Sequence, residues 1–203
     1  MAARFFHYTA VIMLSGVFAF ERLVSGPAFR QSGASLTGAA ALRQRLGWLA
    51  WANLALALAS GAAWLVAVAV GMSGKPFGTA LLQGAVPIVL TRTRFGEDWL
   101  VRLGLAVALG FCLLVQGGRR WRASRAIGWT ALLLAAAMLA SLAWAGHGAS
   151  TPGPAGDLHL AADLCHLLAA GLWLGTLLPL VLLLAEGRRT RPPTMHCSPR
   201  IRP

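Results

Sequence analysis

Residues 47–70 read GWLAWANLALALASGAAWLVAVAV, a continuous run that contains no charged side chain. A helix needs about 20 apolar residues to cross the roughly 30 Å hydrocarbon core of a bilayer, and this run is long enough. It lacks the alternation of apolar and polar residues that a strand of a membrane barrel would show. A helix also satisfies its own backbone hydrogen bonds inside lipid. The run therefore predicts a membrane-spanning helix.

The rest of the chain has the composition of an integral membrane protein. Its 203 residues are 57% hydrophobic and only 12% charged, and the mean hydropathy is +0.66. Similar apolar runs recur, each bounded by charge, glycine or proline, and together they predict five spans: Phe5–Leu23, Gly47–Val70, Trp99–Gln116, Ile127–Gly146 and Leu160–Ala185. We expect an all-α fold, a polytopic transmembrane helical bundle.

One further apolar stretch, Phe77–Leu90, is too short to cross the bilayer comfortably and contains Gln83, Gly84 and Pro87. An interfacial or re-entrant helix is the expected structure. The bundle would then consist of about five spans plus this one short helix.

The arginines give independent evidence on topology, because short cytoplasmic loops collect Lys and Arg. They cluster at residues 22–45, 119–125 and 188–202, whereas residues 147–157 contain none. These three basic segments share one side of the membrane only if Phe77–Leu90 does not cross. The N-terminus is then outside and the C-terminus cytoplasmic. The loop with Lys75, Arg92 and Arg94 fits this scheme less well, although Glu97 and Asp98 partly offset its charge.

The net charge of +12 would indicate nucleic-acid binding in a soluble protein. Here the arginines lie between spans, where topology and anionic lipid headgroups account for them, so no nucleic-acid partner is expected. Residues 1–186 form one predicted membrane domain, and residues 187–203 a disordered basic tail rich in Pro and Arg. The sequence contains no HExxH, P-loop, nucleophile-elbow or Rossmann glycine pattern, so we do not expect an enzyme.

Polar side chains gather at the start of the last predicted span. His159, Asp163 and His166 are spaced by four and then three residues, so they line one face of a helix. On the predicted topology this polar stripe (His159, Asp163 and His166) lies in the outer half of the bilayer. His147, at the end of the preceding span, and His7, in the first span, would lie at a similar depth. The five side chains are candidate metal ligands.

Two interpretations of the stripe remain open from spacing alone. Ionisable groups inside a span usually mark an ion, proton or substrate path, and imidazole with carboxylate suits Cu(II), Zn or haem iron. Alternatively, His159 and Asp163 lie at the outer interface and need no special partner, which leaves only His166 clearly inside the membrane. On the same helix, Gly171 and Gly175 form a small-xxx-small pair that lets another helix approach closely, so this face is a candidate contact between copies of the chain.

The stretch from His159 to Leu180, HLAADLCHLLAAGLWLGTLLPL, resembles the signature of the copper resistance protein D (CopD) family of bacterial inner-membrane proteins. In that family an Asp, a His three residues later and a Trp-Leu-Gly follow a Gly-His turn. The corresponding residues here are Asp163, His166, Trp173–Gly175 and Gly146–His147. TRFGEDWLVRLGLA at residues 93–106 and ARFFHYTAVIMLSGVFAF at residues 3–20 are similar to two earlier family segments.

The resemblance implies copper handling at the inner membrane, as uptake or transfer of copper ions from the periplasm, beside a periplasmic CopC-type copper-binding partner. It assigns the metal-ligand role to His147, His159, Asp163 and His166, with His7 as a fifth position. Longer family members continue with further spans, so this chain is expected to be shortened at its C-terminus. Two alternatives remain: a membrane electron-transfer protein with haem b between histidines such as His7 and His166, or an inactive membrane fragment.

Overall fold

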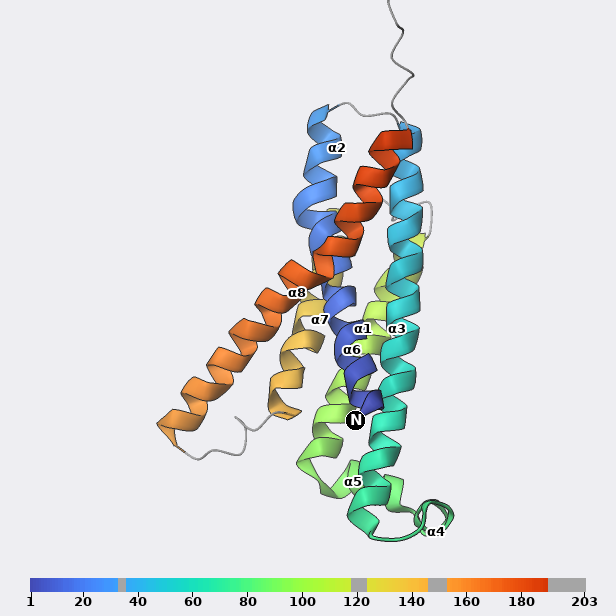
Figure 1. The fold of residues 1–203 in the computed structure, drawn as a ribbon, viewed down its shortest axis with the longest axis vertical. Coiled ribbons are helices and arrows are strands. Elements are labelled where there is room, and N and C mark those ends of the chain that lie inside the picture. Colours follow the sequence, from blue (N-terminus) through green and yellow to red (C-terminus); the bar gives the residue numbers. More distant parts are fainter. Residues whose placement is uncertain (33–35, 118–123, 146–152, 190–203) are drawn as a thin grey trace, which may run out of the picture.

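A computed structural model describes residues 1–32, 36–117, 124–145 and 153–189 of the chain (Figure 1). Within these ranges the protein is helical and contains no strand. The elements in chain order are α1 (Ala2–Ala19), a π-helical segment (Phe20–Ser25), α2 (Gly26–Ser32), α3 (Leu36–Ser73), α4 (Phe77–Leu82), α5 (Ala85–Arg92), α6 (Arg94–Gly117), α7 (Arg125–Ala140), a 3₁₀ segment (Ser141–Ala145) and α8 (Pro154–Arg189). The last residues of the predicted tail, 190–203, lie outside the described residues.

The prediction of five spans is confirmed. In the described part of the chain, five helical stretches are long and apolar enough to cross a membrane: Ala2–Phe29, Gly38–Ser73, Arg94–Gly117, Arg125–Ala145 and Pro154–Arg188. The first is α1 continued through the π-helical segment into α2. It is longer than the predicted Phe5–Leu23 because the backbone stays helical past Glu21 and Arg22. The protein is an all-α, multi-pass membrane bundle.

The stretch Phe77–Leu90 does not cross the bundle. It forms two short helices, α4 and α5, where the sequence predicted one, because Gly84 adopts a left-handed conformation (φ 72°) between them. Both lie at one end of the bundle, between the antiparallel α3 and α6 (Figure 1). The helix ends that flank the three arginine-rich segments consequently all lie at the opposite end, which we call the basic end.

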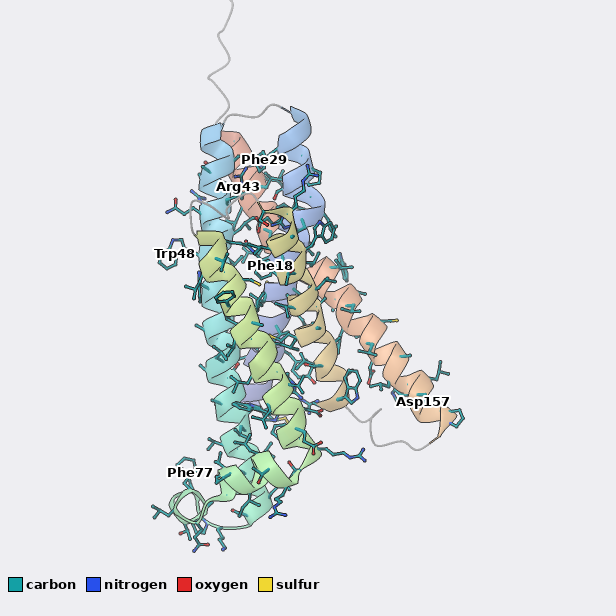
Figure 2. All side chains as sticks on the ribbon, turned by 180° about the vertical axis from the view of Figure 1, so that it is seen from behind. Phe18, Phe29, Arg43, Trp48, Phe77 and Asp157 are labelled. Atoms are coloured by element: carbon teal, nitrogen blue, oxygen red, sulfur yellow. The ribbon has the colours of Figure 1, made fainter. Side chains whose placement is uncertain are left out.

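The α1 helix lies at the centre of the bundle and packs against α3, α7 and α8. Figure 2 shows Phe18 of α1 in the interior. Phe18 belongs to a buried cluster whose members come from four helices and include Leu14, Leu42, Leu46, Leu109 and Leu139. Polar contacts add to this packing: the Ser15 hydroxyl of α1 donates to the Ala135 carbonyl of α7 at 2.9 Å, and the Trp99 indole of α6 donates to the Gly61 carbonyl of α3 at 3.0 Å. Such close packing and interhelical hydrogen bonds hold helices together where lipid removes the hydrophobic driving force.

The small-xxx-small pair on α8 does permit a close helix crossing, but the partner is α1 of the same chain. A Cβ added to Gly16 would lie 2.0 Å from the Gly175 carbonyl carbon, and one added to Gly171 would lie 2.5 Å from Leu139 Cδ2. The predicted contact between copies through the Gly171/Gly175 face is corrected accordingly, since a second chain could use this face only by displacing α1.

On the N-terminal side of this crossing, α8 has few neighbours. Figure 1 shows its first half diverging from α1 and α7, and Figure 2 shows Asp157 at the far end of the helix, away from the bundle. Only 17% of the most apolar window of α8 is buried, compared with 56% for the first span. By this measure α8, the helix that carries the polar stripe, is the least buried of the five spans.

Candidate metal site

The stripe residues occupy the diverging half of α8. His159 and His166 are exposed and Asp163 is half-buried. The α8 face that meets the bundle carries the buried Gly171 and Gly175 and the partly buried Leu167, which packs on the core. At about 100° of rotation per residue, the histidines lie more than a quarter-turn around the helix from that face. The stripe thus faces sideways from the bundle and not into its core.

The described residues contain no group of three or more His, Cys, Asp or Glu side chains close enough to hold a metal ion. His147 lies outside the described residues, so its distance from the stripe is not defined. The stripe alone supplies imidazole and carboxylate donors from one helix face. Its assignment as a metal site stays a prediction.

His7 lies near the start of α1 and faces α3 and α6, on a different side from the stripe. Its ring is 4% exposed, and its Nδ1 lies 2.9 Å from the Ala57 carbonyl oxygen of α3. Because a carbonyl accepts, Nδ1 carries the proton and donates it. Gly61 permits the contact, since a Cβ there would lie 3.2 Å from His7 Cε1. Nε2 is left buried with a lone pair and without a hydrogen-bond partner.

This tautomer is the one that metal-binding histidines adopt. A ligating histidine commonly donates its second ring N–H to a backbone carbonyl, which fixes the ring and leaves the other nitrogen for the metal. Taken alone, the Ala57 contact would favour His7 as a ligand.

A buried arginine beside His7 opposes that role. Arg102 of α6 is 2% exposed, and its guanidinium lies 5.5 Å from the centroid of the Trp64 ring. It lines the same cavity of about 20 Å³ as His7, and it is close enough to act on the imidazole electrostatically. A fixed positive charge in the same cavity disfavours a second cation on Nε2.

The guanidinium lies over the Trp64 ring and interacts electrostatically with Asp98, but it lacks hydrogen-bond partners. None of its nitrogens has a hydrogen-bond partner, and no carboxylate of the described residues lies within 4.0 Å of it. Buried charges in membrane spans are costly and usually paired. The cavity has room for a single water molecule, and a water there could accept from Arg102 and donate to Nε2 of His7.

Comparison with known proteins identifies the family. The family described as "Copper resistance protein D-like, N-terminal domain" matches residues 1–157, more than half of the chain. The chain belongs to the copper resistance protein D family. Copper resistance protein D of Pseudomonas syringae pv. tomato is 35% identical over 195 residues, which is 93% of this chain and 56% of that protein. The chain therefore spans little more than half the length of this curated relative. No solved structure gives a significant match.

The family match and the match to the Pseudomonas protein cover different candidate ligands. The family's N-terminal domain ends at residue 157, just before the stripe, and it includes His7 and His147. The match to the Pseudomonas protein leaves out only about 7% of the chain, so it necessarily extends over His159, Asp163 and His166. The stripe therefore lies within the segment aligned with a protein whose name refers to copper.

Two ionisable residues inside spans were not singled out from the sequence. Arg102 lies eight residues into α6, and Glu21 lies in the π-helical segment after α1. The signal was present in both cases, since a charge within an apolar run is by default a candidate functional residue. Both residues lie inside predicted spans, Phe5–Leu23 and Trp99–Gln116, but only the polar groups of the last span and the histidines were considered as candidates.

Proposed function

We propose that this protein takes up or transfers copper ions from the periplasmic side of the bacterial inner membrane. The observation that carries the proposal is family membership over most of the chain, with a 35% identical relative named copper resistance protein D. The proposed orientation puts the basic end in the cytoplasm, following the arginine distribution. The N-terminus and the start of α8 then face the periplasm. Copper is the cargo in this proposal and no chemical reaction is catalysed.

The stripe is the proposed copper route. His159 is nearest the outer end of α8, and Asp163 and His166 follow at about 6 Å and about 10 Å along the helix axis, given a rise of 1.5 Å per residue. Imidazole nitrogens and a carboxylate oxygen suit Cu(II). We propose that His147 and His159 receive the ion and that Asp163 and His166 hold it one step further inward. His7, beside Arg102, would have the weakest role of the five.

Exposure of the stripe supports transfer from a partner. A periplasmic CopC-type protein could approach His159, because this residue is exposed on the half of α8 that diverges from α1 and α7. A donor on the partner could complete the coordination during transfer. The stripe would then be a shared site, which is consistent with its small number of ligands within the described chain.

The test is copper affinity of the purified full chain, measured by competition with a chelator of known affinity. His159→Ala, Asp163→Asn and His166→Ala should each weaken binding by at least about tenfold, since loss even of an outer-shell partner costs that much. Asp157→Asn is the matched control: it removes a carboxylate from the same helix, at an exposed position outside the stripe. Unchanged affinity in all three stripe variants would contradict the proposed route.

A second measurement separates binding from function. Cells that express the protein should accumulate more copper than cells with the triple stripe variant, at equal amounts of protein in the membrane. If wild type and variant accumulate the same copper as cells without the protein, uptake is refuted even where binding is observed.

A further inference from the structure

A cavity of about 500 Å³ lies between α1, α3 and α6 at the basic end, far from the stripe. Its size falls within the range of small-molecule sites, about 300–1,000 Å³. Its lining includes Glu21, Arg43, Leu46, Trp51, Leu113 and Gln116.

The cavity is polar at one end and apolar at the other. Leu46, Trp51 and Leu113 line its deeper part, towards the middle of their helices. Glu21, Arg43 and Gln116 lie nearer the helix ends that meet the arginine-rich segments. Figure 2 shows Arg43 towards that end of the bundle and Phe18, which also lines the cavity, below it. An amphiphile with its polar group towards the basic end matches this gradient.

The polar end holds opposite charges that do not pair directly. Glu21 is half-buried, and Arg22 and, more weakly, Arg43 act on it electrostatically. No ion pair within 4.0 Å joins Glu21 to either arginine in the described structure. The Gln116 amide nitrogen is buried without a hydrogen-bond partner. Separated charges of both signs across a cavity are complementary to a zwitterion.

The backbone at Glu21 differs from that of an ordinary span. Phe20–Ser25 is π-helical, and such segments inside α-helices are frequent at functional sites. The wider turn lies where α1 passes into α2 and carries an ionisable side chain at membrane depth. A carboxylate at that depth is expected to have a specific partner.

We propose that this cavity binds a phospholipid with a primary-amine zwitterionic headgroup, of the phosphatidylethanolamine type. The ammonium would donate to Glu21, the phosphate would accept from Arg43 and Gln116, and an acyl chain would lie along Leu46, Trp51 and Leu113. The site is independent of copper handling, which is proposed for the other end of the bundle.

The proposed site should distinguish phospholipids by their headgroups. A primary ammonium has three N–H donors for a carboxylate. A choline headgroup has the same charge but no N–H donor, and a glycerol headgroup has no positive charge for Glu21. Loss of one charge-assisted hydrogen bond corresponds to about tenfold in affinity. The ethanolamine lipid should therefore bind about tenfold more tightly than the choline lipid with the same acyl chains.

The test is native mass spectrometry of the delipidated full chain with ethanolamine, choline and glycerol phospholipids at equal concentrations. The wild type should bind the ethanolamine lipid most tightly. Glu21→Gln should reduce ethanolamine-lipid binding to the level of the choline lipid, and Arg43→Gln should weaken all three. Arg45→Gln is the matched control, because it removes the same charge from the same helix, where the Arg45 guanidinium pairs with Glu186 at 3.5 Å outside the cavity.

Equal binding of the ethanolamine and choline lipids by wild type would overturn the proposal, and that comparison requires no variant to fold. Retained preference in Glu21→Gln would overturn it as well. Ethanolamine lipid with brominated acyl chains gives a second readout. This lipid should quench the tryptophan fluorescence of the wild type more than the tryptophan fluorescence of Trp51→Phe. If both proteins lose the same absolute fluorescence intensity, the cavity is excluded as the binding site.

Discussion

The close crossing of α1 and α8 predicts how much alanine substitutions at different glycines destabilise the protein. A methyl group at Gly16 would lie 2.0 Å from the carbonyl carbon and 2.2 Å from the carbonyl oxygen of Gly175. Both are backbone atoms, so the clash cannot be relieved by rotation of a side chain. The two helices would have to move apart by more than an ångström, which would loosen the main contact that α8 makes with α1.

Gly16→Ala should therefore destabilise the protein by about 1–3 kcal/mol or more, the usual cost of overpacking. Gly171→Ala should cost less, because its Cβ would meet Leu139 Cδ2, the end of a flexible side chain. Gly104→Ala is the control: a Cβ there meets nothing within 4 Å, and alanine is the better helix former by up to about 1 kcal/mol.

The assay is unfolding of the purified proteins in mixed micelles by increasing SDS, followed by circular dichroism. The predicted order of stability is Gly104→Ala at or above wild type, then Gly171→Ala, then Gly16→Ala. A Gly16→Ala protein as stable as wild type would show that α8 does not cross α1 at this contact. The direction in which the stripe faces would then also be wrong, because it was derived from the α8 face that packs on α1.

Three further predictions concern topology, the buried arginine and pH. Reporter fusions after residue 117 and after residue 189 should both be active on the cytoplasmic side, and a periplasmic signal from either would contradict the orientation assigned from the arginines. Arg102→Leu should leave thermal stability unchanged or raise it, since an unpaired buried charge is costly; a protein that fails to fold would show instead that Arg102 has a partner essential for folding. Copper affinity should fall when the pH is lowered from about 7 to about 5, because imidazole must be neutral to coordinate, and an affinity independent of pH would exclude histidine ligands.

Most of the membrane topology could be predicted from the sequence. Uninterrupted apolar runs located the five spans, and the arginine clusters placed Phe77–Leu90 at one end without crossing. These features depend on local composition, because apolar runs partition into lipid and arginine-rich loops stay on one side of the membrane. The break of that stretch into α4 and α5 was missed, because it depends on the left-handed conformation of the single residue Gly84.

The partners of helix faces were harder to predict. The spacing of Gly171 and Gly175 correctly indicated a close crossing, but nothing in it specified that Gly16 of the same chain is opposite. Likewise, the spacing of His159, Asp163 and His166 placed them on one face of a helix, while the direction of that face depends on how α8 packs. The environment of His7, with the Ala57 carbonyl and Arg102, comes from α3 and α6 and was therefore not accessible from the α1 sequence.

The central claim is that copper binds to the polar stripe of α8. X-ray absorption spectroscopy of the copper-loaded full chain tests it most directly, with the His159→Ala/His166→Ala double variant measured beside it. Wild-type protein should show a nitrogen and oxygen shell with the scattering pattern of imidazole, and the double variant should lose that pattern. A sulfur shell, or an imidazole pattern that is the same in both proteins, would contradict it.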